Sequence, residues 1–316
     1  MNCFFGVDVG GTTVKIGLFT PKGALMEKWE IPTNKQESGR RILPDIAASL
    51  REKCRQKGWR FSEMSGIGLG VPGPVTENGT VLKCINLGWD VFSVTETLQD
   101  LTGLPVFAGN DATVAALGET AALEEPVKNS VLVTLGTGVG GGIVLNGDIL
   151  YGSVGAAGEI GHIHVCDTEE ETCSCGNRGC LEQYASASGF VRVAKKLLQK
   201  TSSPGLLTAC LQEMTARDIF DCAKKGDPLA NRIVDLGCFY LGQALAITAC
   251  VINPELFILG GGVSKAGPIL IERTEPVFRK YAFHACRNAR FVLASLGNDA
   301  GIYGAARLVL NSLKTK

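Results

Sequence analysis

The sequence lacks the features that mark proteins binding nucleic acid or membranes. Its 31 basic residues balance 31 acidic ones, and Lys and Arg form no cluster that would attract a phosphate backbone or anionic lipid. No basic segment followed by an apolar run opens the chain, so MNCFFGVDVGG predicts a first strand and not a signal peptide. The longest apolar run, 233–252, contains Asp235 and Gln243, which favours a buried helix over a membrane span. We therefore expect a cytoplasmic protein with no nucleic-acid or membrane partner.

Low-complexity sequence and long linkers are also missing. The 316 residues, 45% of them hydrophobic, are enough to bury a large core and predict two domains that meet closely around a cleft. We place them at residues 1–117 and 118–316, with the last helix packing back on the N-terminal domain.

Two common nucleotide-binding motifs are absent as well. No G-x-x-x-x-G-K-[ST] string occurs, so the chain is not a P-loop protein. G-x-G-x-x-G matches residues 68–73 and 136–141, but Pro72 and Pro74 interrupt the first match and a strand-like GGIVLNG follows the second. A dinucleotide site needs a helix directly after the turn, so we expect no nicotinamide cofactor.

What the chain does contain is one design used twice. Residues 3–20 and 130–150 each predict an apolar strand, a Gly/Thr turn and a returning strand. The remaining elements alternate, which predicts an α/β fold. We expect strands at 65–71, 104–108 and 256–261, and helices at 40–58, from Asp111, and at 184–200, 216–225, 229–252, 268–283 and 299–312.

The two turns, 8–13 and 134–138, expose backbone N–H groups that can form a nest for phosphate oxygens. Glycines 260–262 follow a third apolar strand and allow a ligand to approach closely. One such turn alone is an ordinary β-turn, but three together resemble the actin/hexokinase-like ATPase superfamily. The resemblance implies two duplicated RNase H-like domains, with the first two loops on phosphates and the third beside adenosine.

Asn110 and Asp111 stand where a predicted strand ends and a helix begins. Capping of the helix explains one of them. A carboxylate at a strand end also points toward the crevice where α/β proteins bind ligands, so Asp111 is a candidate general base once Asn110 provides the cap. Phosphoryl transfer requires one such group to accept the proton of the attacking hydroxyl.

Twelve cysteines are present, and a cytoplasmic location favours reduced thiols. Most are scattered singly through apolar segments and predict core packing, for example Cys210, Cys222, Cys238 and Cys250.

Cys173, Cys175 and Cys180 differ, because they form C-x-C-x4-C around two glycines. Three soft thiolates and one imidazole favour a tetrahedral zinc site, for which His162 is a plausible fourth ligand with His164 and Cys166 as rivals. A solvated loop with incidental thiols and a redox pair are the alternatives, although Cys173 and Cys175 lack the two-residue spacing of the thioredoxin motif.

Carboxylates flank the cysteines on both sides. Glu159 and Glu182 bracket the cluster and, with His162, suit a polyhydroxylated ligand. We interpret Glu169 to Glu171 as an exposed, solvated run.

Together these motifs resemble the ROK family of sugar kinases, most of all its glucose-phosphorylating bacterial members. GEIGH (158–162) followed by CSCGNRGCLE (173–182) is similar to the family signature, in which a His and three Cys hold zinc. The resemblance covers nearly the whole chain and includes DVGGTTVKIGLF, GVPGPV, NLGW, GNDA, LVTLGTGVGGGI, LGGGVS and LGNDAG.

The resemblance implies a role for individual positions. It makes Asp111 the catalytic base and His162, Cys173, Cys175 and Cys180 the ligands of a structural zinc. Sugar ligands would be Asn110, Asp111, Glu159, His162 and Glu182, with Gly73 and Asn86 as weaker candidates. Nucleotide positions would be Asp8 near magnesium, Gly10, Gly11, Thr12, Thr13, Lys15, Thr137, Gly138 and Gly261. The family motif usually continues Asn-Asp-Ala-Asn, and Thr113 here replaces the final Asn.

We therefore expect a kinase that uses ATP and Mg²⁺ to phosphorylate a hexose, glucose at its 6-hydroxyl first of all. N-acetylmannosamine, mannose, allose and fructose are rival substrates, and polyphosphate is a rival donor. A sugar-responsive repressor is disfavoured, because such proteins carry a DNA-binding segment before the first hairpin and Asp8 arrives almost at once. A homo-oligomer, dimer or tetramer, is also expected.

Overall fold

A computed structural model describes residues 2–199, 206–207 and 213–314, which divide into two compact units. The first unit comprises residues 1–128, 142–158 and 295–316, and the second comprises 129–141 and 159–294. The chain thus passes between the units four times, whereas the sequence analysis placed a single boundary after residue 117. The last helix, α9 (Ala300–Lys314), belongs to the first unit.

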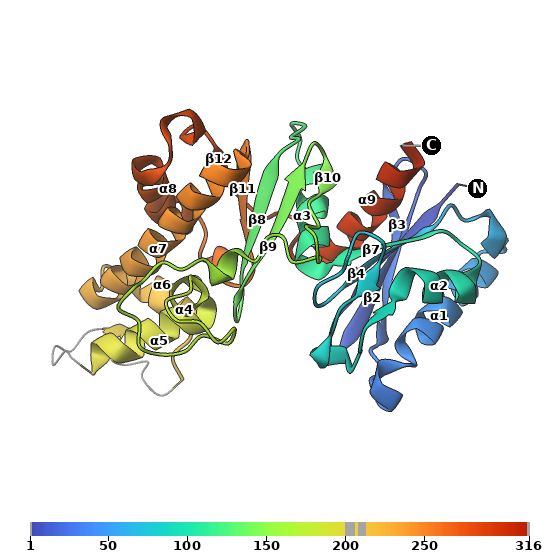
Figure 1. Ribbon diagram of the computed structural model, residues 1–316, viewed down its shortest axis with the longest axis horizontal. Helices are drawn as coiled ribbons and strands as arrows, with labels where there is room; N and C mark the ends of the chain where they lie inside the picture. Colours follow the sequence, from blue (N-terminus) through green and yellow to red (C-terminus); the bar gives the residue numbers. More distant parts are fainter. Residues whose placement is uncertain (1, 200–205, 208–212, 315–316) are drawn as a thin grey trace. The chain divides into compact units, whose positions relative to one another are not determined.

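The first unit is built on a five-stranded sheet with the order β3-β2-β1-β4-β7 (Figure 1). An antiparallel meander begins it, and two parallel strands follow β1. The strands are β1 (Phe4–Val9), β2 (Thr13–Phe19), β3 (Leu25–Pro32), β4 (Ile67–Val71) and β7 (Val106–Asn110). The predicted first hairpin and the strands near 65–71 and 104–108 are confirmed.

Both faces of this sheet are covered by helices, and β1 is correspondingly apolar except at Asp8 near its end. Phe5 and Val7 belong to the core that includes α1 (Ile42–Gln56), whereas Phe4 packs on the opposite face with α9. Glycine permits the close approach of α9. A Cβ atom on Gly68 would lie 1.7 Å from the carbonyl oxygen of Ala305.

The remaining elements of this unit are short, apart from α3, which follows β7 directly. They are α2 (Val94–Thr102), α3 (Asp111–Ala121), β5 (Thr80–Val81), β6 (Phe92–Ser93) and β10 (Asp148–Ile149). Helix α3 packs closely on α9. Glycine is needed on both helices at this contact: a Cβ on Gly304 would lie 1.7 Å from the oxygen of Val114, and one on Gly118 would lie 2.7 Å from the nitrogen of Gly304.

The second sheet repeats the first, with the order β10-β9-β8-β11-β12. Strands β8 (Ser130–Leu135) and β9 (Val139–Leu145) form the second predicted hairpin. Strands β11 (Leu256–Gly260) and β12 (Arg290–Leu293) continue in parallel from β8. The internal echo seen in the sequence is therefore a repeated sheet order.

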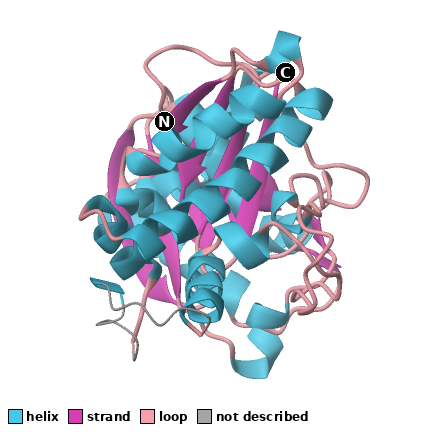
Figure 2. Cartoon of the chain, turned by 90° about the vertical axis from the view of Figure 1, so that its left-hand side faces the viewer, coloured by secondary structure: helices cyan, strands magenta, loops and turns pink. Residues whose placement is uncertain are grey.

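Helices of the second unit lie in front of its strands in the view of Figure 2. They are α4 (Glu182–Ala185), α5 (Ala187–Leu198), α6 (Ala216–Lys224), α7 (Pro228–Ile252) and α8 (Ile269–Tyr281). The helix predicted at 184–200 is divided at Ser186, whose hydroxyl caps α5 by accepting from Gly189 N–H at 2.9 Å. Residue 200 lies outside the described residues.

Helix α7 is long and apolar enough to cross a membrane by length and composition, but 61% of its most apolar window is buried inside the protein. It packs against α6 and α8 as a core helix. Cys222 and Cys238 are buried as expected, whereas Cys250 is exposed on α7, so the prediction of core packing is wrong there. Cys210 lies outside the described residues.

Candidate active site and metal centre

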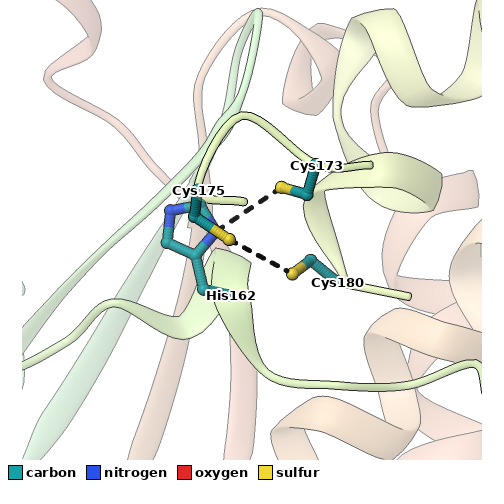
Figure 3. Close-up of side chains that lie close together, drawn as sticks. All are labelled: His162, Cys173, Cys175 and Cys180. Carbon is teal, nitrogen blue, oxygen red and sulfur yellow. Dashed lines mark hydrogen bonds between the residues drawn. The ribbon is translucent and has the colours of Figure 1, made fainter. Parts of the chain in front are cut away.

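Four side chains of the second unit converge on one point. One ligand atom each from His162, Cys173, Cys175 and Cys180 lies within 4.8 Å of the others (Figure 3). The Cys175 and Cys180 sulfur atoms are 3.7 Å apart, and Cys173 Sγ is 3.8 Å from His162 Nδ1. Sulfur atoms of a tetrahedral zinc site with bonds of about 2.3 Å lie about 3.8 Å apart, so this spacing fits the ion.

Local backbone geometry brings the three sulfur atoms together. Gly176 and Gly179 adopt positive φ, 91° and 71°, which other residues rarely do. Cys173 N–H donates to Asn177 O at 2.7 Å, which closes the turn between the first two ligands. A Cβ on Gly179 would lie 2.0 Å from Cys166 O, so only glycine fits at this position. We call residues 162–182 the knuckle.

The two rival ligands lie outside the cluster. His164 uses both ring nitrogens elsewhere, 2.8 Å from Asp167 Oδ1 and 2.9 Å from Arg178 O. Cys166 Sγ is instead 3.5 Å from Thr168 Oγ1. The geometry therefore selects His162 among the three candidates that the sequence left open.

Crowding of the thiols has an electrostatic effect. Burial first of all, together with the neighbouring thiols of Cys175 and Cys173, raises the pKa of Cys180 to about 12. A bound cation would reverse this effect by favouring the thiolates, so the chemistry of the donor set also fits zinc.

Carboxylates lie beside the cluster on two sides. Glu159 Oε2 is 3.9 Å from His162 Nε2, the ring nitrogen that does not face Cys173. Glu182 accepts hydrogen bonds from Val139 N–H at 3.0 Å and from Ser174 Oγ at 2.9 Å. These contacts bring His162, Glu159 and Glu182 around the cluster, as the sequence analysis expected.

Glu169, in contrast, is not part of a solvated run. Only 5% of its side chain is exposed, and it accepts from Tyr184 Oη at 2.6 Å, Arg192 Nη2 at 2.7 Å and Lys196 Nζ at 3.1 Å. These donors outweigh the effect of burial and hold the pKa of Glu169 well below its usual range. The prediction failed because Arg192 and Lys196 lie on α5, outside the local sequence that was considered.

In the first unit, Asn110 caps α3 and leaves Asp111 at its first turn. Asn110 Oδ1 accepts from Ala112 N–H at 3.0 Å and Thr113 N–H at 3.2 Å, while its Nδ2 donates to Gly73 O at 3.0 Å. Thr113, which replaces the usual Asn, donates its hydroxyl to the same oxygen at 3.3 Å. Its hydroxyl thus supports the cap.

Asp8 lies near the end of β1, in the same unit. Burial raises the pKa of its carboxyl to about 6; Lys15 opposes this shift and Asp111 adds to it. Lys15 is its cross-strand partner and donates to Asn298 O at 3.1 Å. The two carboxylates, Asp8 and Asp111, are therefore close enough to interact.

The glycine turns keep backbone groups accessible. Gly10 N–H donates to Thr13 O at 3.0 Å, which closes the first turn and leaves Gly11 and Thr12 exposed. In the second turn Gly136 N–H donates to Gly138 O at 3.0 Å, and Thr137 is exposed.

Two further candidates are glycines with positive φ. Gly261, with φ of 83°, would place a Cβ 2.6 Å from the backbone of Leu135, at the base of the second turn. Gly73, with φ of 89°, would place one 2.8 Å from Lys83 O. Asn86 is exposed on a short 3-10 segment, Ile85–Leu87.

A cavity of about 510 Å³ beside Gly262 was not foreseen. Its lining comes from the start of α6 and from the loop after β11, and includes Thr215, Arg217, Phe220, Val263 and Lys265. The sequence carried one signal for part of it, the capping box of Thr215 and Asp218, which marks the start of α6.

Two sheets of the same strand order, each opening with a glycine hairpin, define a protein of the actin/hexokinase-like ATPase fold. The sequence matches the ROK family over residues 4–312. The chain belongs to the ROK family. It is 44% identical to a glucokinase of Halalkalibacterium halodurans over 97% of this chain and 94% of that protein.

Solved structures agree with this assignment. A ROK hexokinase from Thermus thermophilus superimposes with a TM-score of 0.82 at 32% identity, over 99% of this chain and 100% of that one. A ROK glucokinase from Streptomyces griseus, in complex with glucose and AMPPNP, gives a TM-score of 0.73 at 31% identity, over 97% and 99%.

Proposed function

We propose that this chain is an ATP-dependent glucokinase that transfers a phosphoryl group to the 6-hydroxyl of glucose. Similarity to glucokinases over nearly the whole chain supports the substrate. The observation that carries the mechanism is the arrangement at the end of β7, where Asn110 provides the helix cap and Asp111 is placed beside it.

In this mechanism Asp111 accepts the proton of the attacking hydroxyl, and the protein otherwise positions substrates and neutralises charge. Hydroxyl groups of the sugar are bound by amide, carboxylate and imidazole side chains, which direct hydrogen bonds strongly. The proposed sugar ligands are Asn110, Asp111, Glu159, His162 and Glu182, with Gly73 and Asn86 beside them.

The glycine turns bind the nucleotide. Exposed N–H groups at 10–13 and at Thr137 and Gly138 hold phosphate oxygens, with Lys15 nearby and Gly261 beside the nucleoside. Asp8, whose buried carboxylate has a raised pKa, fits a position near Mg²⁺, which neutralises phosphate charge when bound. The cavity beside Gly262 favours ATP over polyphosphate, since polyphosphate has no nucleoside to fill it.

His162, Cys173, Cys175 and Cys180 would hold a structural zinc ion. With Nδ1 of His162 directed to the cluster, Nε2 is left to donate toward the sugar. When bound, zinc would fix the orientation of this imidazole and supply no group to the chemical step.

Two properties of the whole protein accompany this function. The eleven described cysteines are free thiols, which supports a cytoplasmic location. Apolar residues exposed on α7, among them Ile247 and Val251, support self-association into a dimer or tetramer.

Measuring ADP release with a panel of sugars tests the substrate. We expect glucose to give the highest kcat/KM among glucose, mannose, fructose, allose and N-acetylmannosamine, and ATP to exceed polyphosphate as donor. Preference for another hexose would replace glucose but retain the kinase. Sugar binding without turnover of any sugar would favour a non-catalytic sensor.

The Asp111→Asn variant tests the base. We expect kcat to fall by roughly 100-fold or more while glucose affinity in a direct titration changes little, because the amide of Asn can still hydrogen-bond to the sugar but cannot accept the proton. Asp100→Asn, an exposed carboxylate on α2, is the matched control and should be fully active. A near-normal rate for Asp111→Asn would remove this residue from the mechanism.

A further inference from the structure

Three hydrogen bonds join the second glycine turn to the last residue of the knuckle and to the residues that follow it. Ala187 N–H donates to Gly136 O at 2.8 Å, and Ser188 Oγ donates to Thr137 O at 2.6 Å. Val139 N–H donates to Glu182 Oε2 at 3.0 Å. All three partners on the knuckle side lie in residues 182–188, which we call the link.

The link is itself tied to the metal ligands. Glu182 Oε1 accepts from Ser174 Oγ at 2.9 Å and lies 3.7 Å from Cys173 Sγ. Gln183 Oε1 accepts from Cys180 N–H at 3.1 Å, and its Nε2 donates to Glu171 O at 2.9 Å. The same seven residues therefore contact the phosphate turn on one side and two of the three cysteine ligands on the other.

Packing leaves this connection little freedom. A Cβ on Gly138 would lie 2.1 Å from Glu182 Oε2, so the carboxylate is in close contact with the turn. A Cβ on Gly161, next to His162, would lie 2.2 Å from Val139 O. Gly189, in the first turn of α5, would place one 2.7 Å from Glu182 O. Movement of the turn must therefore displace the link, the knuckle, or both.

We propose that Ser188, as a positioning residue, and Glu182, in addition to its proposed contact with the sugar, couple nucleotide binding at the turn to the metal cluster and, through it, to sugar affinity. The inference rests on the proposed function for the identity of the two ligands. Phosphate oxygens that engage the N–H groups of the turn hold Thr137 and Val139 in one arrangement. The link then favours the arrangement of Ser174 and Cys173 seen here, which orients His162.

Coupling of this kind is reciprocal. If the nucleotide raises sugar affinity by some factor, the sugar must raise nucleotide affinity by the same factor. Coupling between sites typically reaches about 5-fold or more, so we expect a non-hydrolysable ATP analogue with Mg²⁺ to tighten glucose binding by about that factor. The same analogue should slow the release of zinc to a chelator.

Ser188→Ala and Ser174→Ala test the two sides of the link, because Ser188 bonds to the turn and Ser174 bonds to Glu182. Each variant removes one hydroxyl from an exposed side chain that is neither a proposed sugar ligand nor a proposed metal ligand. We expect each variant to bring the effect of the analogue on glucose affinity below about 2-fold. Zinc release from Ser174→Ala without either ligand should be about 10-fold faster, as for other partners of metal ligands. Ser312→Ala, which removes a hydroxyl bond to Leu308 O in the first unit, is the control.

Calorimetric titration of glucose with and without the analogue, and a colorimetric zinc-release assay, give these numbers. The inference is overturned if the unmodified protein binds glucose equally well with and without the analogue. It is also overturned if both serine variants keep the full effect of the analogue on glucose affinity and Ser174→Ala releases zinc at the unmodified rate. A protein that shows the coupling but phosphorylates no sugar would instead contradict the proposed function.

Discussion

At the scale of single residues, the burial of Asp8 links the stability of the fold to pH. Its pKa is raised from 3.8 to about 6, mainly by burial, so the folded protein binds this proton more tightly than the unfolded chain does. The contribution of Asp8 to stability is therefore greatest below about pH 4 and declines as the pH rises through 6. At neutral pH the charged carboxylate destabilises the fold.

Asp8→Asn should consequently stabilise the protein where it harms catalysis. Without Mg²⁺, we expect the free energy of unfolding to rise by about 1–3 kcal/mol at pH 8 and to change little at pH 4. Urea denaturation at the two pH values measures this difference. Asp218→Asn should instead lower the free energy of unfolding at pH 8, because Thr215 donates two hydrogen bonds to the Asp218 carboxylate and lowers its pKa. Equal effects of Asp8→Asn at both pH values would contradict the interpretation.

A second residue-scale prediction concerns Cys175, the exposed cysteine of the proposed zinc site. Cys175→Ser should lose the metal and weaken glucose binding by about 10-fold or more, because His162 would no longer be held in one orientation. Metal content by mass spectrometry and a glucose titration measure the two effects. Cys250→Ser removes an exposed thiol outside the cluster and should change neither the metal content nor the glucose affinity. A Cys175→Ser protein without zinc but with normal sugar affinity would separate the ion from the substrate site.

At the scale of elements, α5 anchors the loop that precedes the cysteines. Arg192 donates to both Glu169 and Glu171 as well as to Gln183 O, and Lys196 contacts the same two carboxylates. Glu169 is almost fully buried, so loss of a partner leaves a charge without compensation. Part of the knuckle is therefore held by ion pairs that do not involve the metal.

Arg192→Met should lower the free energy of unfolding by about 2–4 kcal/mol. Glu169→Gln should lower the free energy of unfolding much less in this variant than in the unmodified protein. A double-mutant cycle measures this difference. Arg273→Met serves as control, since Arg273 pairs with Asp235 at an exposed site where such pairs contribute about 1 kcal/mol or less. Additive losses at Arg192 and Glu169 would show that the network is not cooperative.

The sequence predicted some helices and strands, but it could not decide the fourth residue of the candidate metal site. Apolar strands around Gly/Thr turns predicted both hairpins, and the long apolar run predicted α7, because these signals are local. The strand β3, with its partly exposed and charged LMEKWEIP, and the short α2 and β12 were missed. The cysteine spacing predicted a metal site, but choosing His162 over His164 required coordinates, because the sequence does not show that His162 ends a 3-10 segment and faces the cysteines while His164 bonds to Asp167 and Arg178.

At the scale of the whole chain, the first unit depends on a helix that follows the entire second unit. Helix α9 covers the face of the first sheet that contains Phe4 and packs on α3. Contact is close because Gly6 and Gly68 present bare backbone to it. The predicted boundary after residue 117 falls inside α3, whereas the prediction that the last helix packs back on the N-terminal domain agrees with the place of α9 in the first unit.

Gly68→Ala tests this contact. The added methyl would meet the backbone of α9, which cannot rotate away, so we expect a loss of about 3 kcal/mol or more in unfolding free energy. Gly262→Ala, where the added atom meets nothing within 4 Å, should be nearly neutral in the same denaturation experiment. Equal stability of the two variants would show that α9 can shift to accommodate the methyl.

The position of α9 also has a consequence for biosynthesis. A ribosome releases β1 to α3 long before it makes residues 300–314, and until then one side of the first sheet has no cover. The nascent protein must keep Phe4, Phe19 and their neighbours from aggregating while about 180 further residues are translated. Early translation arrest should therefore yield an aggregation-prone fragment that a chaperone binds, although most of its strands are already complete.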